Sequence, residues 1–392
     1  MKMRTYRFRI YPSKAQEKQM CQHLWLAKNL WNDLLEHSKE LYRNFDKFPT
    51  RNSLQLMVKD TGMFSQTSQE IAHRVENGIW RYMKLRKAGN KKAGFPRFRS
   101  ADRMKSLNYP QFGFFLEKKL KVNPFGEIPI VRHREVNGKI KTLTLKREAS
   151  GKWFACFAVE EPPAIRLANG GSRIGIDLGL RVLATLSNGS KINNPRHIRK
   201  HQEKIAFLQR LSNRKKKGGK NRVRAKQKVA VEFEKLKNVR RDFLHKLSKN
   251  LVDSYSFIAL EDLASQELAE QNFGKQIYDA GWGELADMLR YKAESAGCEI
   301  MFVNPKDTTK TCCICGNMAD MPLAVRIYDC HNCGNHMDRD LNAAYNILKR
   351  ATAGSAESNA CGDVSKKTSV KQEAIASPSG RLGQFTTLQP LS

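Results

Sequence analysis

The first residues of the chain alternate between apolar and basic side chains. Tyr6, Phe8 and Ile10 take the apolar positions, and arginines stand between them. A period of two is typical of a β-strand with one buried face, and Pro12 predicts where that strand ends. We therefore expect a strand at the N-terminus.

Two later segments repeat their apolar residues at helical spacing instead. The first begins at Ser13, a residue type that favours the N-cap of a helix, and the second covers Ser68 to Lys87. Their apolar stripes contain Leu24, Leu30, Trp31, Leu34 and Leu35 in the first helix, and Ile71, Val75, Ile79 and Tyr82 in the second. We predict two helices, with Trp31 and Trp80 as anchors of the core.

The organisation changes twice further along the chain. Residues 107–160 are rich in Gly, Pro and alternating apolar positions, which predicts a small β-barrel or sheet that the N-terminal strand could complete. Beyond a linker at 161–163, strands alternate with long helices, which indicates an α/β domain. Residues 355–392 are polar and rich in Ser, Gly and Ala, and we predict that they are disordered.

The charge of the chain narrows its partners. Seventy Lys and Arg stand against 38 Asp and Glu, a formal net charge of +32, which favours a polyanion. The sequence has no apolar run of the ~18 residues needed to span a membrane, and its first residues do not resemble a signal peptide. We expect an intracellular protein. The nine cysteines do not form the pattern of a disulfide framework.

Much of the excess charge lies in two segments. Residues 81–105 hold ten Lys or Arg and one acid, and they interleave arginines with aromatics in the run 95–99. Residues 196–249 hold twenty Lys or Arg and four acids, with helical apolar spacing that is interrupted at 218–219. Either segment could be a solvated surface, but the interleaved aromatics and the size of the charge favour nucleic-acid contact. We predict a basic helical hairpin over 196–249.

Acids lie at the ends of two apolar strands and at the start of a helix. Asp177 follows the strand that begins at Arg173, Glu261 follows the strand over 257–260, and Asp340 begins a helix. Taken singly, each acid could be an ordinary turn, cap or solvated residue. Together, such acids can converge on one pocket and supply the hard oxygen ligands that Mg²⁺ prefers.

Two CxxCG knuckles predict a zinc ribbon. They begin at Cys312 and Cys330, and fourteen residues separate Cys315 from Cys330. A redox dithiol would explain one CxxC but not two, and each glycine lets the backbone fold back around a metal. Matching the knuckles through their glycines selects Cys312, Cys315, Cys330 and Cys333, while Cys313 offers a shifted register and His331 and His336 are spare ligands. Four protein ligands would make this zinc structural.

The order of these segments resembles the RuvC-type, RNase H-like nucleases, in particular the TnpB (OrfB) proteins of bacterial insertion sequences, which are related to type V CRISPR nucleases. Nearly the whole chain takes part. The matching segments are Phe8–Pro12, Gly94–Phe98, Gly175–Gly179, Arg240–Lys246, Leu260–Leu263 and Asp279–Gly283.

The resemblance implies a metal site of Asp177, Glu261 and Asp340, holding two catalytic Mg²⁺ ions, beside one structural Zn²⁺. Asp262 should point away from Glu261, because side chains alternate along a strand. Asp338 competes with Asp340, and the family pattern favours the second acid of the Asp-Arg-Asp unit.

The resemblance also implies the activity: RNA-guided cleavage of double-stranded DNA next to a short transposon-adjacent motif. The partners would be a transposon-derived guide RNA and the target DNA, with no membrane, in a prokaryotic cytoplasm at the nucleoid; the oligomeric state stays open. Two alternatives remain: an RNA-guided DNA-binding regulator without cleavage, and a transposase.

The implied architecture is a multidomain α/β, α and β fold. A β-barrel wedge domain would take 1–12 and 93–165, and a helical recognition domain 13–92. An RNase H-like (RuvC) nuclease domain would take 172–305 and 336–352, with the zinc ribbon inserted at 306–335.

Overall fold

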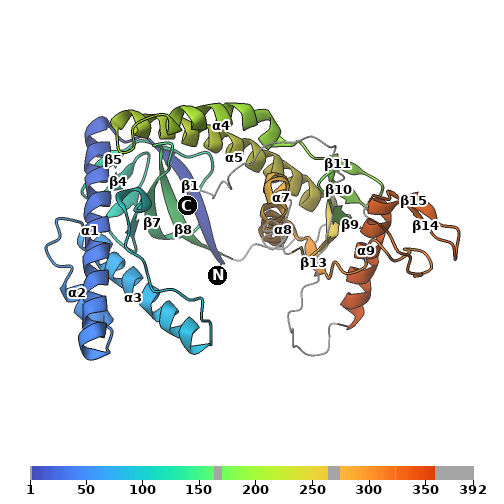
Figure 1. Cartoon of the computed structure of the whole chain (residues 1–392), viewed down its shortest axis with the longest axis horizontal. Coiled ribbons are helices and arrows are strands. Elements are labelled where there is room, and N and C mark those ends of the chain that lie inside the picture. Colours follow the sequence, from blue (N-terminus) through green and yellow to red (C-terminus); the bar gives the residue numbers. More distant parts are fainter. Residues whose placement is uncertain (1, 163–169, 264–273, 323, 358–392) are drawn as a thin grey trace. The chain divides into compact units, whose positions relative to one another are not determined.

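The computed structural model describes residues 2–162, 170–263, 274–322 and 324–357 (Figure 1). The chain divides into two compact units, with the division between residues 163 and 164 of the sequence. The predicted tail, 355–392, lies almost entirely outside the described residues. Within the described part of the chain, no helix combines the length and the apolar character that crossing a membrane requires.

The first unit is built on antiparallel sheets. A five-stranded sheet has the order β2-β7-β8-β1-β6, and a three-stranded sheet has the order β3-β4-β5. The strands are β1 (Lys2–Ile10), β2 (Ser106–Tyr109), β3 (Phe114–Leu116), β4 (Leu120–Val122), β5 (Gly126–Ile128), β6 (Ile130–Val131), β7 (Lys139–Arg147) and β8 (Trp153–Glu161). The predicted N-terminal strand is confirmed, and it pairs along its whole length with β8. The barrel form remains a prediction.

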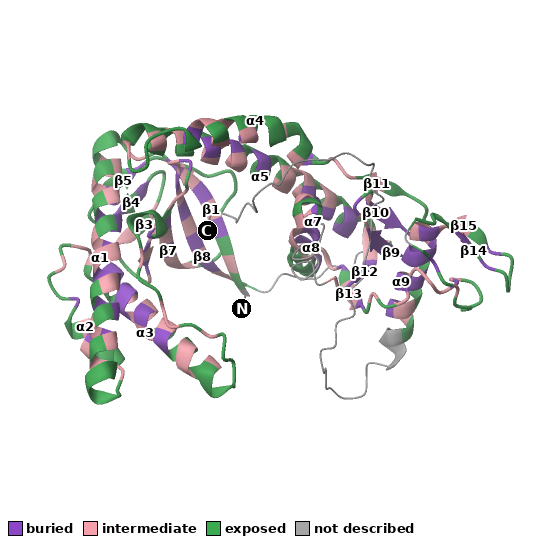
Figure 2. Cartoon of the chain, in the orientation of Figure 1, coloured by how far each residue is buried: buried purple, intermediate pink, exposed green. Residues whose placement is uncertain are grey.

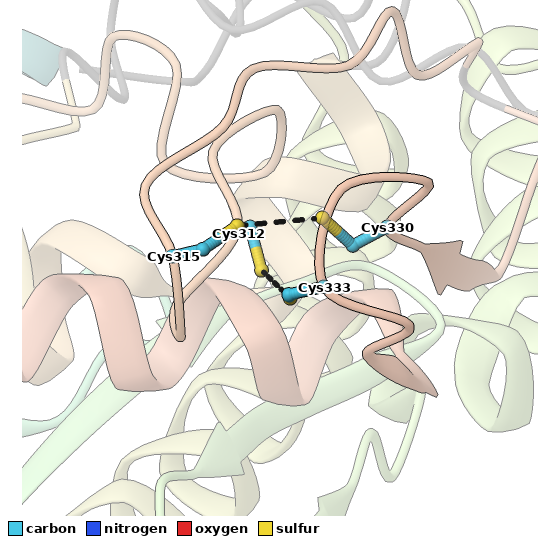
Figure 3. A group of neighbouring side chains, drawn as sticks. All are labelled: Cys312, Cys315, Cys330 and Cys333. Atoms are coloured by element: carbon cyan, nitrogen blue, oxygen red, sulfur yellow. Dashed lines mark hydrogen bonds between the residues drawn. The ribbon is translucent and has the colours of Figure 1, made fainter.

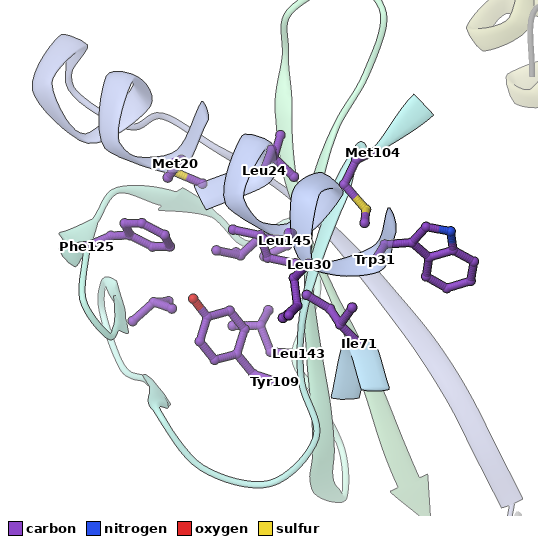
Figure 4. Packing of buried hydrophobic residues seen from close by; sticks show 14 of the residues in the cluster. Met20, Leu24, Leu30, Trp31, Ile71, Met104, Tyr109, Phe125, Leu143 and Leu145 are labelled. Carbon is purple, nitrogen blue, oxygen red and sulfur yellow. The ribbon is translucent and has the colours of Figure 1, made fainter. Parts of the chain in front are cut away.

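Three helices belong to the same unit: α1 (Lys14–Phe45), α2 (Arg51–Leu56) and α3 (Ser65–Lys87). Ser13 caps α1 as predicted, in a reciprocal capping box with Gln16. The apolar stripes of α1 and α3 pack with the inner sides of the strands in one core (Figure 4). Trp31 belongs to this core with 5% of its surface exposed.

The prediction that Trp80 anchors the core is wrong. Its side chain is 62% exposed, whereas Ile79 beside it is buried. The buried positions of α3 include Ile71, Val75 and Ile79, which follow one another at intervals of four residues. Trp80 stands about 100° around the helix from Ile79, and this turns it out of the stripe and towards solvent.

The second unit contains one mixed sheet with the order β11-β10-β9-β12-β13. Its strands are β9 (Ser172–Leu178), β10 (Val182–Leu186), β11 (Lys191–Asn193), β12 (Tyr255–Glu261) and β13 (Glu299–Val303). β9, β10 and β11 pair antiparallel, whereas β12 is parallel to both β9 and β13.

Helices cover both faces of this sheet. The described helices of this unit are α4 (His197–Asn213), α5 (Lys220–Ser254), α7 (Gly274–Ala280), α8 (Trp282–Ala296) and α9 (Arg339–Glu357). Residues of α5 and α8 pack on one face, and residues of α9 pack on the other. A short hairpin of β14 (Ile327–Asp329) and β15 (His336–Asp338) leads into α9.

The predicted basic hairpin is confirmed as the pair α4 and α5. The glycines at 218–219 lie between the two helices, as expected, and α5 continues to Ser254. The outer surface of the pair is largely exposed (Figure 2). Glu232 is an exception, because it is buried and forms ion pairs with His201, Lys204 and Lys235. One internal acid thus links three basic side chains of the hairpin.

Candidate functional site

Four cysteines form a compact cluster in the second unit (Figure 3). The Sγ atoms of Cys312 and Cys333 are 3.7 Å apart, those of Cys315 and Cys330 are 3.5 Å apart, and all four lie within 4.8 Å of one another. A tetrahedral metal with bonds of ~2.3 Å to sulfur separates its ligands by roughly 3.8 Å. The cluster therefore has the dimensions of a single four-thiolate metal centre.

The two knuckles place these thiols by the same turn. The N–H of Gly316 donates to the carbonyl of Cys312 over 3.0 Å, and that of Gly334 donates to Cys330 over 2.8 Å. Both glycines have positive φ, +77° and +69°, a conformation that other residues rarely adopt. The sequence requirement for glycine at these positions thus has a direct backbone cause.

The alternative ligands lie outside the cluster. The Cys313 Sγ is 3.7 Å from the thioether of Met337, and burial raises the pKa of the Cys313 thiol. His336 pairs with Asp329 through Nδ1, and His331 is exposed and is not part of the four-residue group. Within the cluster, the Asn332 side chain and the backbone N–H of Asn317 lower the pKa of Cys315 to about 6.

Asp177 and Glu261 lie side by side at the ends of β9 and β12. Leu260 pairs with Ile176, so the residues that follow them, Glu261 and Asp177, occupy neighbouring positions on two parallel strands. Both are buried, with 3% and 2% of their surfaces exposed. Two acids at equivalent levels of adjacent strands form the centre of the candidate site.

Both carboxylates face the side of the sheet that α9 covers. On β12, Phe257 and Ala259 pack with Ile347 of α9, while Ile258 packs with the opposite core. Side-chain alternation puts Glu261 on the same side as Phe257 and Ala259. Asp262 is exposed, as the prediction that it points away from Glu261 requires.

On β9, Gly175 makes the close approach of α9 possible. A Cβ atom at this position would overlap the carbonyl oxygen of Ala344 in α9. Asp177, two residues further along β9, projects to the same side. Asp340 lies in the first turn of α9, one turn before Ala344, and is partly buried. The three predicted acids therefore lie towards the same end of the strands, on the face of the sheet that α9 covers.

These acids are not gathered as tightly as the cysteines. In the part of the chain that the structure describes, the four cysteines are the only group of three or more His, Cys, Asp or Glu residues with all ligand atoms within 4.8 Å. Asp177, Glu261 and Asp340 do not form such a group.

Asp338 has a different role from Asp340. Its Oδ1 accepts hydrogen bonds from the N–H groups of Asp340 and Leu341, at 3.0 and 3.2 Å, and so caps α9. Its Oδ2 pairs with Lys191 of β11 at 2.6 Å. Burial alone would raise the pKa of Asp338, but Lys191 and the helix N–H groups hold it below its ordinary value.

Two polar groups at the site were not foreseen. Thr308, which is fully buried, donates a hydrogen bond from Oγ1 to Glu261. Asn346 of α9 donates in turn to the carbonyls of Thr308 and Thr311, at 2.9 and 2.6 Å. Asn342 and Asn346 stand four residues apart on the buried face of α9, with 0% and 3% of their surfaces exposed. Two asparagines at helical spacing are the pattern in the sequence that could have indicated these hydrogen bonds.

Three family models match successive parts of the chain. A helix-turn-helix model of the OrfB family of IS605 elements matches residues 1–47, the OrfB model described as "Probable transposase" matches 156–272, and a Cas12f1-like TNB-domain model matches 282–347. A protein of Streptomyces pristinaespiralis, provisionally named an RNA-guided DNA endonuclease, is 30% identical over 403 residues, covering 96% of this chain and 98% of its own. The chain belongs to the TnpB (OrfB) family.

Two further relatives match nearly all or about half of the chain. The protein InsQ of Escherichia coli K12, also provisionally named an RNA-guided DNA endonuclease, is 27% identical over 405 residues, with 95% and 97% of the two chains covered. The CRISPR-associated endodeoxyribonuclease Cas12f1 of Sulfoacidibacillus thermotolerans is 24% identical over 216 residues, with 51% and 50% covered. The resemblance to TnpB proteins seen in the sequence is confirmed.

Proposed function

We propose that this TnpB-family protein is an RNA-guided endonuclease that hydrolyses phosphodiester bonds of DNA at Asp177, Glu261 and Asp340. The observation that carries the assignment is the pair of buried carboxylates at the same level of β9 and β12, on the face that α9 covers. Full-length relatives named as RNA-guided DNA endonucleases support the same activity.

The donor set fits Mg²⁺. Three carboxylates offer hard oxygen ligands, and Asp177 and Glu261 are buried where a cation would offset the cost of holding two negative charges together. Asp177, Glu261 and Asp340 would together hold the two Mg²⁺ ions that the resemblance to TnpB proteins implies.

When bound, such ions supply activation of water and stabilisation of negative charge on the leaving oxygen. The protein itself contributes orientation. Thr308 fixes Glu261 through its hydroxyl, and Asp338 fixes the first turn of α9, which carries Asp340. These contacts hold ligands from two elements, β12 and α9, in place before substrate arrives.

The four-cysteine cluster is proposed to hold one structural Zn²⁺. Four thiols leave no coordination position for substrate, and the Sγ separations match a tetrahedral site. The N–H of Cys313 donates to Asn342 of α9 over 3.0 Å, so the knuckle is anchored to the helix that carries Asp340. Zinc would therefore stabilise the surroundings of the catalytic acids.

The architecture supports an RNase H-like (RuvC) assignment for the second unit. Three antiparallel strands followed by two parallel strands, with helices on both faces, form a mixed α/β sheet in which acids end two adjacent central strands. The proposed domain limits are those predicted from the sequence, with the wedge and recognition domains in the first unit. A location at the prokaryotic nucleoid remains a prediction.

The proposed partners are a transposon-derived guide RNA and double-stranded target DNA with a short adjacent motif. A net charge of +32, with twenty Lys and Arg in 196–249, gives strong backbone affinity for nucleic acid. Base pairing with the guide would then supply sequence choice, as in other RNA-guided effectors.

The deciding experiment changes the guide. RNA that co-purifies with the protein from its native host should be one discrete species, and replacing its guide segment should move the cut in target DNA accordingly. A cut that stays at one place whatever the guide favours the transposase that one family description names. Guided binding without any cut favours the regulator.

A further inference from the structure

The first unit contains a cavity that combines arginines with aromatic rings. Its volume is about 510 Å³, within the ~300–1,000 Å³ of typical small-molecule pockets. Its charged lining residues are Arg81, Arg97, Arg99 and Arg103, and no acid is among the described residues that line it. A concave surface with this charge favours an anionic ligand.

The arginines have the freedom to bind such a ligand. Arg81, Arg97 and Arg103 are exposed, and none of them forms an ion pair with another described residue. Arg99 is half-buried, and both burial and the nearby charge of Arg74 lower its pKa. Concentrated positive charge without a matched acid is the arrangement that phosphate groups complement.

Aromatic side chains form the other part of the lining. They are Trp31, Tyr82 and Phe98. Phe98 is 44% exposed, and the Lys39 ammonium lies 4.0 Å from the centre of its ring. With one face of the ring beside Lys39, the other face can stack on a planar group. The Arg99 guanidinium already lies over the Trp31 ring at 3.8 Å, so these two lining side chains hold each other in place.

The loop that carries these side chains is fixed to α1. The Trp31 indole donates to the carbonyl of Arg97 over 3.2 Å, and Asn32 exchanges two hydrogen bonds with the backbone of Arg99, at 3.0 and 2.8 Å. Phe95 stacks on Phe48 and meets Tyr82 edge-on. A pocket held in this way loses little entropy when it binds a ligand.

We propose that this pocket binds one unpaired nucleotide, with the base against Phe98 and the phosphate between Arg97, Arg81 and Arg103. The volume suits one nucleotide, and a stacked aromatic requires a base whose face is free of its own neighbours. The inference rests on the proposed function only in taking nucleic acid as the partner. It goes further in assigning a single-strand site to a defined cavity.

The test measures binding of a short fluorescent single-stranded oligonucleotide to the full-length chain, freed of nucleic acid at high salt. EDTA is present, so neither guide nor cleavage enters the readout. Phe98→Leu keeps the apolar bulk but removes the ring, and it should weaken binding about tenfold. Its matched control is Phe112→Leu, because Phe112 is 67% exposed and lies outside the lining, and it should change binding little.

A second pair of variants separates the pocket from general charge. Arg97→Gln and Lys84→Gln each remove one exposed positive charge from the same basic segment, but only Arg97 lines the cavity. Arg97→Gln should cost about tenfold in affinity and Lys84→Gln no more than about twofold. Oligonucleotides of the same sequence in RNA and DNA are compared, and the tighter one identifies the strand that the pocket serves.

A 4-thiouridine oligonucleotide, crosslinked by light, should label a peptide that contains residues 97–99. The proposal is wrong if each pocket variant weakens binding no more than its matched control does. It is also wrong if inorganic phosphate alone displaces the single-stranded oligonucleotide, or if duplex competes for the protein as well as single strand does. If the protein binds the single-stranded oligonucleotide as expected but does not cut DNA where its guide directs, the proposed function is wrong and the assignment of the pocket is unaffected.

Discussion

The hydroxyl of Thr308 donates a hydrogen bond to the carboxylate of Glu261, 47 residues earlier in the chain. Both side chains are buried, and the carbonyl of Thr308 is itself held by Asn346 of α9. The chain then continues through Thr311, whose carbonyl accepts from Asn342, into the cysteine knuckle. One short segment therefore connects a proposed catalytic ligand, the helix that carries another, and the cysteine centre.

This contact predicts that Thr308→Val lowers cleavage about tenfold, because supporting partners of metal ligands typically contribute 10–100-fold. Valine matches threonine in shape but cannot donate to Glu261. The Mg²⁺ concentration for half-maximal cleavage should rise, while RNA binding stays unchanged. Thr308→Ser restores the hydroxyl and should recover most of the activity. If Thr308→Val lowers only the melting temperature and leaves the Mg²⁺ dependence as it was, Thr308 is merely structural.

The acids themselves give a sharper prediction. Asp177→Ala, Glu261→Ala and Asp340→Ala should each abolish cleavage of a labelled duplex, because each removes a hard oxygen ligand. Gel shifts in EDTA should show that binding to RNA and DNA survives, since the Lys and Arg segments supply it.

Asp262→Ala is the matched control, because Asp262 neighbours Glu261 but is exposed. Asp338→Asn is a second control, because asparagine still caps α9 while the ion pair with Lys191 is lost. Both should retain most of the activity. Vigorous cutting by Asp177→Ala would end the assignment of the nuclease site, whereas loss in Asp338→Asn but not in Asp340→Ala would move the third ligand to Asp338.

The sequence was sufficient wherever a local pattern determined the outcome. Apolar strands ending in Asp177 and Glu261 placed both acids at a sheet edge, and two CxxCG units brought four cysteines together. It was insufficient where the neighbouring element decides. Trp80 is a different case, because it lies one position outside the buried stripe of α3 and helical spacing alone already separates it from Ile79. Thr308 contacts Glu261 only because the tertiary fold brings them together, so no spacing in the sequence predicts that hydrogen bond.

For the cysteine centre, we expect about one zinc per chain and its loss in Cys315→Ser or Cys330→Ser, measured by metal analysis. Thermal stability should fall as well, because structural metal binding is coupled to folding. Cys313→Ser is the matched control, since Cys313 lies in the same knuckle but outside the group of four. Full zinc content in both ligand variants would show that the assignment is wrong.

Gly175 provides the last prediction, because it couples packing to catalysis. The Cβ of Gly175→Ala would overlap the carbonyl of Ala344, and the backbone of α9 must move to relieve the contact. Overpacking of this kind typically costs about 1–3 kcal/mol, so the melting temperature should fall by several degrees. Cleavage should fall further than stability alone explains, because Asp340 lies one turn before Ala344 and moves with the helix.

The matched control is Gly170→Ala, because no atom of the described residues lies within 4 Å of a Cβ at that position and its backbone needs no glycine conformation. It should leave both the melting temperature and cleavage near their original values. Shortening Ala344 to glycine cannot rescue Gly175→Ala, since the clash is with a backbone oxygen. If the Gly175→Ala protein is destabilised but cleaves normally, cleavage does not depend on the position of α9, and Asp340 is not a ligand of the proposed metal site.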